Sequence, residues 1–376
     1  MSKVALAAVV VIVAAVVVVA VWPPPRAPIQ ATVAVREALA EERAGFARVD
    51  APRPLSFPAD HGPHPDFRTE WWYYTGNLKT AAGRHVGFQL TFFRVALAPT
   101  SQPRASVWAT RQLYFAHFAV TDTMSGRFHA ASRVSRGALG LAGAEAAPFR
   151  VWVDSWSAEG AGASPRLSAS DGDVALELEL SATKPVVLHG DRGLSRKGAE
   201  PGNASLYYSF TRMPAIGTIR LGAETLSVSG EAWMDREWST SGLGAGVVGW
   251  DWFAIQLNDG REVMVYLLRR GDGTVDPFSA GSLVAADGTV RRLGAGDVQV
   301  ETLAHWKSPK SGVRYPARWQ LSVPAADLRF AIEPRLADQE LRVNTRYWEG
   351  AVSVTGSSPE GPIGGEGYVE LVGYGE

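Results

Sequence analysis

The sequence predicts an all-β protein built from two tandem antiparallel barrels that follow an N-terminal apolar segment. An aromatic segment at residues 70–78 occurs a second time, in similar form, at residues 249–257. From about residue 60 onward, short alternating runs are separated by turn signals that contain Gly, Asn and Asp. No convincing amphipathic helix interrupts them. Many short strands with regular turns indicate a sandwich or barrel, and the repeated segment favours two barrels of similar plan.

The repeated segment predicts a β-hairpin. Each copy passes through a polar Gly-Arg turn into an apolar run that ends at an arginine, Arg94 in the first copy and Arg269 in the second. Because side chains alternate along a strand, every second residue shares a face. The aromatic residues that share a face are Trp71 and Tyr73 in the first copy, and Trp250 and Trp252 in the second. We expect these hairpins to occupy equivalent places in two domains, each with an aromatic interior.

Composition excludes several classes of function. The chain of 376 residues has a net charge of −1, with 37 basic and 38 acidic residues, so it presents no basic field for nucleic acid. It contains no cysteine, which excludes disulfides, thiolate catalysis and zinc–thiolate sites. Its 13 tryptophans supply large apolar surfaces. A protein that acts on an apolar small molecule fits these properties better than one that binds a polyanion.

The N-terminal segment predicts export. Val4 to Trp22 carries no charged residue and is followed by three prolines and Arg26. This length can span a bilayer as one helix. A cleaved signal peptide usually has a shorter apolar core and small residues at its cleavage point, and the tolerable site here is Val18-Val19-Ala20. We expect residues 1–25 to be an uncleaved signal anchor, with a cleaved signal peptide as the alternative. In a bacterium, the remaining chain would face the periplasm or be secreted.

The rest of the chain is expected to form a stalk and two barrels. Residues 26–57 combine a helix-compatible mixture of Ala, Leu, Glu and Arg with proline-rich flanks, which is typical of a linker. The strand pattern is interrupted between Arg212 and Gly217. We therefore expect a first barrel over residues 58–220 and a second over residues 221–376. About eight to ten strands in each half would enclose one small ligand.

Five motifs resemble the lipocalin-like family that includes bacterial carotenoid 1,2-hydratases and the AttH-like predicted secreted hydrolases. They are Glu70 to Gly76, Gln89 to Arg94, Phe115 to Asp122, Gly230 to Ser241, and Trp250 to Gln256. The resemblance spans nearly all of the chain after residue 58. It implies two tandem lipocalin-like barrels, a hydrophobic guest, and neither a metal nor an organic cofactor. The hydratases carry a Tyr-His-Asp motif that reads Trp233-Met234-Asp235 here, which places the chain nearer the AttH-like branch.

Three acidic residues in aromatic surroundings are candidate catalytic acids, namely Asp235, Glu237 and Glu70. Adding water to an isolated alkene requires a carboxylic acid that an apolar site keeps protonated, and aromatic rings that stabilise the resulting cation. The alternative is that these carboxylates are structural partners of buried arginines such as Arg94 and Arg236. A carboxylate that points into a cavity without an arginine partner would favour the enzyme.

The candidate ligand-binding residues come from the same motifs. They are Trp71, Trp72, Tyr74, Arg94, His117, Trp238, Trp250, Trp252 and Tyr266. His117 lies on an alternating strand, where a core role is the alternative to a site role. No metal site is expected, because His61 and His64 lack a third ligand at a usual spacing.

Two classes of function remain, with a third of lower rank. The first is a membrane-tethered binding protein for a lipid or terpenoid. The second is a cofactor-independent enzyme, either a hydratase-like lyase or a hydrolase, although no Gly-x-Ser-x-Gly elbow indicates a serine hydrolase. The third is a carbohydrate-binding module. Its candidate platform residues are Trp152, Trp156, Trp306, Trp319 and Trp348.

Overall fold

The structure is a computed structural model that describes residues 44–100, 106–241 and 243–375. The chain divides into two compact units, residues 1–32 and 33–376, and the description below concerns the second. Apart from two short 3-10 helices, η1 (Ala59–His61) and η2 (Pro324–Ala326), the regular secondary structure of its described part is all strand. The predicted all-β class is therefore confirmed. The predicted anchor and most of the predicted stalk lie outside the described residues, among which no helix is long and apolar enough to cross a membrane.

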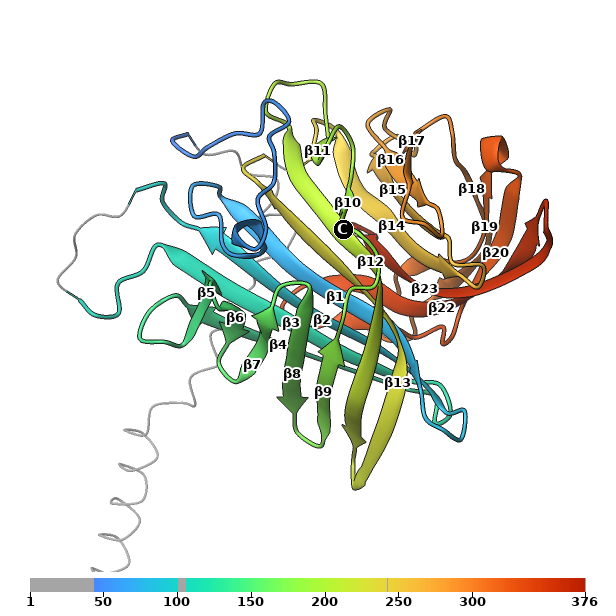
Figure 1. The fold of residues 1–376 in the computed structure, drawn as a ribbon, viewed down its shortest axis with the longest axis horizontal. Helices are drawn as coiled ribbons and strands as arrows, with labels where there is room; N and C mark the ends of the chain where they lie inside the picture. Colours follow the sequence, from blue (N-terminus) through green and yellow to red (C-terminus); the bar gives the residue numbers. More distant parts are fainter. Residues whose placement is uncertain (1–43, 101–105, 242, 376) are drawn as a thin grey trace, which may run out of the picture. The chain divides into compact units, whose positions relative to one another are not determined.

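The first of two sheets is antiparallel and nearly closed (Figure 1). Its edge strands are β4 and β5, and side chains of β4 bond to residues 154 and 155 in the turn between β6 and β7. Arg133 on β4 donates to Ser155 Oγ at 2.7 Å, and Ser135 donates to Asp154 at 2.8 Å. The 13 strands are β1 (Thr69–Lys79), β2 (His85–Ala96), β3 (Gln112–Asp122), β4 (Arg127–Arg136), β5 (Ala142–Ala146), β6 (Phe149–Val153), β7 (Trp156–Ala161), β8 (Ser164–Asp171), β9 (Val174–Leu180), β10 (Val187–Leu188), β11 (Leu194–Arg196), β12 (Ala204–Leu221) and β13 (Glu224–Ser239).

The second sheet is a half-barrel of 10 antiparallel strands. They are β14 (Val247–Leu257), β15 (Glu262–Arg270), β16 (Ala280–Val284), β17 (Val290–Gly294), β18 (Gln299–Lys307), β19 (Arg314–Val323), β20 (Leu328–Pro334), β21 (Glu340–Arg342), β22 (Arg346–Ser358) and β23 (Gly361–Val372). Chain order places the division between the sheets after Ser239 and before Val247, later than the expected boundary near residue 220. The interruption between Arg212 and Gly217 that indicated the boundary lies within the continuous strand β12, next to a register shift between Phe210 and Met213.

The two aromatic hairpins have matching registers. Glu70 lies opposite Arg94 in the β1–β2 pair, and Gly249 lies opposite Arg269 in the β14–β15 pair. Their aromatic faces, however, do not line the barrel interiors, and that expectation is wrong. Trp72 and Tyr74 fill the interior of the first sheet, whereas Tyr73 and Trp252 belong to a separate cluster between the sheets. Both faces of these strands are buried, so alternation alone could not distinguish the inner from the outer face.

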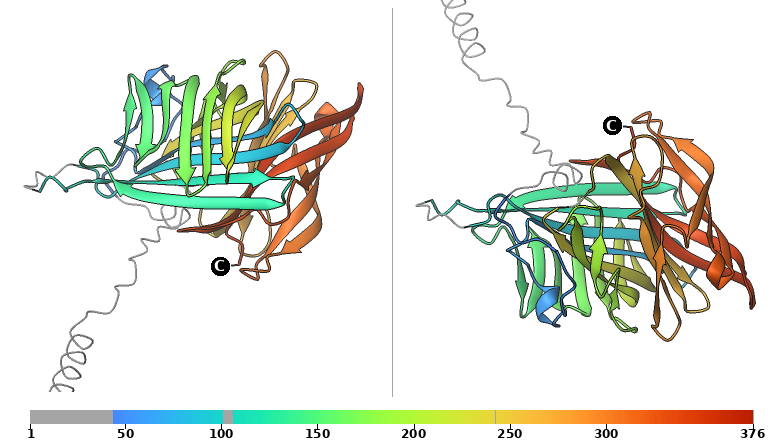
Figure 2. Two further views of the ribbon diagram at one scale, coloured as in Figure 1. Left: turned by 90° about the horizontal axis from the view of Figure 1, so that it is seen from below. Right: turned by 90° about the horizontal axis from the view of Figure 1, so that it is seen from above.

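The sheets pack against each other along these outer faces, with β1 and β2 next to β22 and β23 (Figure 2). Asn77 Nδ2 on β1 donates to the carbonyl oxygen of Gly367 on β23 at 3.1 Å. At Gly87 on β2, an added Cβ would lie 2.7 Å from the Cβ of Ala351 on β22, so the close approach requires glycine there. This contact fixes the position of the two walls of the cavity described next.

Candidate functional site

A cavity of about 810 Å³, counting the part open to solvent, lies between the two sheets. Seven of its 16 lining residues are aromatic, and three carboxyl groups and one ammonium group face it. The lining residues are Trp71, Tyr73, Phe93, Lys197, Ser205, Tyr207, Asp235, Glu237, Ser239, Ser241, Leu243, Trp250, Trp252, Tyr266, Leu268 and Glu370.

Strand alternation explains which side chains of the first sheet face the cavity. On β12, Tyr207 points to the cavity, while its neighbour Tyr208 lies in the interior of the first barrel. On β13, Asp235 and Glu237 point to the cavity, while Trp238 lies in that interior. Both faces of β12 and β13 are buried at these positions, so each strand supplies one face to the cavity and the other to the barrel interior.

Asp235 is held in the cavity wall by neutral donors. Its carboxyl group accepts hydrogen bonds from the Tyr207 hydroxyl at 2.6 Å, from Trp233 Nε1 at 2.6 Å, and from the Ser209 hydroxyl. Trp252 Nε1 from the second sheet donates in turn to the Tyr207 oxygen at 3.2 Å. Among the described residues, no basic side chain forms an ion pair with Asp235. The side chain is therefore oriented without a compensating charge.

The surroundings of Asp235 shift its pKa toward the pH at which a general acid works. The residue is only 5% exposed, and its burial raises the pKa to about 7, against the hydrogen bonds from Ser209, Tyr207 and Trp233 that favour the carboxylate. A carboxyl group with a pKa near the working pH can both donate and accept a proton. Asp235 is thus suited to acid–base chemistry on a molecule in the cavity.

Glu237 faces the same cavity with a different partner. Lys197, which follows β11, places Nζ 3.3 Å from the Glu237 carboxylate and 3.8 Å from the centre of the Tyr266 ring. Burial works against the charge of Lys197, but the Glu237 carboxylate gives it a net rise in pKa. Lys197 is consequently an ammonium ion and not a nucleophile. The sequence analysis missed Lys197, because it lies outside every motif.

The second sheet contributes a carboxyl pair that the sequence analysis also missed. Glu370 on β23 lines the cavity and lies directly opposite Glu349 on β22. Trp250 Nε1 donates to Glu370 at 2.5 Å, and the Tyr73 hydroxyl donates to Glu349 at 2.6 Å. The available signal was that Glu370 stands between the apolar residues Val369 and Leu371, but only strand pairing shows that Glu370 and Glu349 meet.

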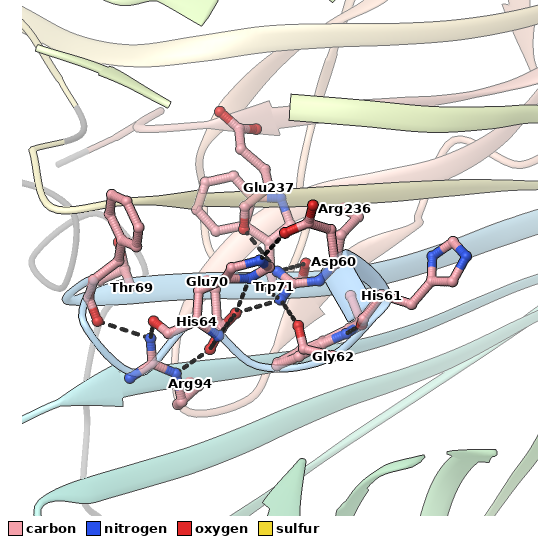
Figure 3. Close-up of polar contacts among 12 residues, drawn as sticks. Asp60, His61, Gly62, His64, Thr69, Glu70, Trp71, Arg94, Arg236 and Glu237 are labelled. Carbon is pink, nitrogen blue, oxygen red and sulfur yellow. Dashed lines mark hydrogen bonds and ion pairs between the residues drawn. The ribbon is translucent and has the colours of Figure 1, made fainter. Parts of the chain in front are cut away.

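Glu70 and Arg94 lie outside the cavity, in a charged cluster beneath β1 (Figure 3). The Glu70 carboxylate forms ion pairs with Arg94 and Arg236 and accepts a hydrogen bond from the backbone of His64 at 3.1 Å. Burial alone would raise the pKa of Glu70, but the two guanidinium groups lower it well below its ordinary value. In Figure 3 the Glu237 side chain points away from this cluster. Glu70 is therefore a permanently ionised structural partner and is not available as an acid.

Three of the predicted ligand-binding aromatic residues, Trp72, Tyr74 and Trp238, also lie outside the cavity. They belong to the interior cluster of the first barrel, where Trp238 stacks on His64 at 3.8 Å. The strand period places them on the face opposite Trp71 and Tyr73. Trp71, Trp250, Trp252 and Tyr266 do line the cavity.

The histidines have structural partners. His117 bonds through Nδ1 to the Tyr347 hydroxyl and through Nε2 to Asn344 Oδ1, both at 2.8 Å, and does not line the cavity. His61 bonds to the Tyr208 hydroxyl at 2.6 Å, and His64 bonds to Asp60 at 2.9 Å. Within the described residues, no group of three or more metal-ligating side chains comes together.

The tryptophans of the suggested carbohydrate platform do not form one surface. Trp156 lies in the core of the first sheet, and Trp319 and Trp348 lie in the core of the second. All three are almost fully buried. They pack the two interiors and cannot present a shared face to a sugar.

Comparison with known proteins identifies similar sequences and folds. The model of the AttH-like family matches residues 48–374. The structure of an AttH protein from Nitrosomonas europaea is 34% identical, with a TM-score of 0.77 over 88% of this chain and 100% of that one. Kievitone hydratase from Nectria haematococca is similar in fold at 15% identity, with a TM-score of 0.65 over 89% and 98% of the two chains. CghA, solved with Sch210972, has a TM-score of 0.51 over the same shares and is also 15% identical. No curated protein matches in sequence.

Proposed function

The chain belongs to the AttH-like family, and we propose that it binds a hydrophobic small molecule between two lipocalin-like barrels and adds or removes water there by acid catalysis. The observation that carries this proposal is the Asp235 carboxyl group, which faces an aromatic cavity and is held only by neutral donors. The fold shared with kievitone hydratase supports the reaction class as an analogy. A hydrolase that protonates its leaving group would use the same residue.

The chemistry follows from the walls of the cavity. Asp235 donates its proton to one carbon of a double bond, which forms a C–H bond and leaves positive charge on the neighbouring carbon. The aromatic rings that line the cavity away from Lys197, Trp252 and Trp71 among them, stabilise that charge. A water molecule then forms the C–O bond and releases a proton to a second group. Removal of water follows the same steps in reverse. The rings define an apolar substrate of lipid or terpenoid class.

Isotope labelling tests the proposal on a substrate whose identity is still open. The protein is incubated in H₂¹⁸O with a hydrophobic extract of its native cells, and mass spectrometry identifies molecules that gain labelled water. Asp235→Asn should lower turnover by about 10²- to 10⁴-fold, because the amide keeps the shape but carries no transferable proton. Glu231→Gln is the matched control, since Glu231 lies on the same strand β13 but outside the cavity lining.

The competing proposal is a binding protein without catalysis. In that case both variants would retain the same co-purifying molecule, and labelled water would enter no product. The apolar probe 1-anilinonaphthalene-8-sulfonate measures whether the cavity still binds in each variant. Full turnover by Asp235→Asn with probe binding unchanged would reject the catalytic role of Asp235.

We also propose that residues 1–25 tether the protein to the inner membrane with the barrels in the periplasm. The charge-free segment from Val4 to Trp22 supports this. Full-length protein should remain in the membrane fraction, whereas a chain that begins near Pro54 should be soluble. A mature N-terminus at Val21 in native cells would instead identify a cleaved signal peptide and a secreted protein.

A further inference from the structure

The wall of the cavity formed by the second sheet carries its own pair of acidic groups. Glu349 and Glu370 are directly opposite residues of β22 and β23, a position that brings side chains within about 5.5 Å at Cβ. Like charges in such a position destabilise a sheet. Glu349 is fully buried, and in the described part of the chain no basic side chain forms an ion pair with either residue. A buried carboxylate and a half-buried one in contact without a cation cannot readily both stay ionised.

The hydrogen bonds around the pair leave one place for a proton. Glu349 Oε1 accepts from the Tyr73 hydroxyl, and Glu370 Oε1 accepts from Trp250 Nε1. Glu349 Oε2 is buried and receives no hydrogen bond from a donor in the described residues. Glu349 and Glu370 are opposite residues of paired strands, and each carboxyl group influences the pKa of the other. A proton held between the two carboxyl groups satisfies the remaining oxygen.

The surroundings of the pair agree with this arrangement. The titratable groups that face it are Tyr73 on β1, Asp235 and Glu237 on β13, Tyr347 on β22 and Tyr368 on β23. None of these five is a cation, and Lys197, the ammonium group of the same cavity, is paired with Glu237. Burial raises the pKa of Glu370 to about 7 and raises the pKa of Glu349 well above its ordinary value.

We propose that Glu370 is a second catalytic residue of the cavity, and that Glu349 is a positioning residue that shares one proton with it. The inference rests on the proposed function. Asp235 and Glu370 occupy walls from different sheets, and Tyr73 connects them, since it is the cross-strand partner of Asp235 and donates to Glu349.

The two groups divide the reaction between them. Asp235 gives its proton to the alkene carbon and becomes a carboxylate. The attacking water forms the C–O bond, and its released proton passes to Glu370, so that the pair then holds two protons. Proton exchange with solvent at the open mouth of the cavity restores both groups. No oxidant, reductant or further reactant is needed.

The pH dependence of turnover tests the role of Glu370. The wild type should lose activity at low pH, where the pair is already doubly protonated, and at high pH, where Asp235 is ionised. Glu370→Gln should lower kcat/KM by about 10²- to 10⁴-fold and abolish the acidic limb. Glu370→Asp should keep that limb. Glu366→Gln is the matched control, because Glu366 lies on the same strand but is paired with Arg335 and Lys79. A Glu370→Gln variant that keeps both its rate and its acidic limb would overturn the proposal.

A second measurement separates this inference from the proposed function and requires no substrate. In protein labelled with ¹³C-glutamate, NMR at pH 7 should show a protonated glutamate carboxyl group whose signal weakens in Glu349→Gln and is unchanged in Glu366→Gln. If turnover survives Asp235→Asn, the hydration mechanism fails while this signal remains. If Asp235→Asn is inactive but no glutamate is protonated in the wild type at pH 7, the shared-proton pair is refuted alone. This test uses the folded wild type, so it stands even if Glu370→Gln does not fold.

Discussion

Glu70 and Asp235 lie on neighbouring strands and are both buried, yet their surroundings favour opposite protonation states. Glu70 faces the interior of the first barrel between Arg94 and Arg236, and these two cations lower its pKa. Asp235 faces the cavity among hydroxyl and indole donors, and burial raises its pKa to about 7. The comparison shows that burial alone does not make a carboxyl group an acid catalyst. The charge of its partners decides between a fixed ion and a mobile proton.

The largest effect should come from removing the Glu70 charge. Glu70→Gln strands Arg94 and Arg236 in a buried site, and should lower the free energy of unfolding by about 3–5 kcal/mol in urea denaturation. Glu179→Gln is the control. It breaks an ion pair with Arg166 in which both side chains are more than half exposed, and should cost less than about 1 kcal/mol. A change of similar size in both variants would contradict the distinction between the two settings.

The next largest effect should be on the pH dependence of stability, to which Glu70 and Asp235 contribute with opposite sign. The folded pKa of Glu70 lies below its ordinary value of 4.5, so its stabilisation is present above that pH and is lost as the pH falls toward the folded pKa. The folded pKa of Asp235 is raised from 3.8 to about 7, so its contribution is present below pH 3.8 and is lost as the pH rises through 7.

Comparing the wild type with Asp235→Asn isolates the contribution of Asp235 to the pH dependence of stability. The wild type should lose up to roughly 4 kcal/mol relative to the variant between pH 4 and pH 8, since each pKa unit corresponds to about 1.4 kcal/mol. Urea denaturation across that range provides the measurement, with Glu231→Gln again as the control on β13. Parallel curves for the wild type and Asp235→Asn would show that Asp235 has an ordinary pKa.

The sequence could predict the fold and part of the site because those features depend on residues that are close together in the chain. Side-chain alternation and turn residues are visible within one short stretch of sequence. We could therefore predict the aromatic hairpins and the cavity residues Asp235, Glu237, Trp71 and Trp250. The same alternation cannot say which face of a strand lies inside when both faces are buried. Trp72 and Tyr74 were therefore expected at the ligand, although they pack the barrel core.

Residues that depend on pairing between distant strands could not be predicted in this way. Glu349 and Glu370 become a pair only because β22 and β23 are in register, and Glu70 becomes an ion only because β2 and β13 bring Arg94 and Arg236 to it. A single sequence shows each of these charges but not its neighbour. The chemical state of a buried carboxyl group is thus a property of the assembled sheets.

The smallest effect should come from two adjacent tyrosines on opposite faces of β12. Tyr207→Phe removes a hydrogen bond to Asp235 and leaves Trp252 Nε1 without its acceptor, whereas Tyr208→Phe removes a bond to His61 in the barrel interior. Each should lower stability by about 1–2 kcal/mol. Only Tyr207→Phe should raise the pKa of Asp235 above about 7, because the lost hydrogen bond favoured the carboxylate. A ¹³C NMR titration of the aspartate carboxyl groups measures this. An equal shift in both variants would mean that the two faces of β12 are not electrostatically distinct, and the comparison between Glu70 and Asp235 would lose its basis.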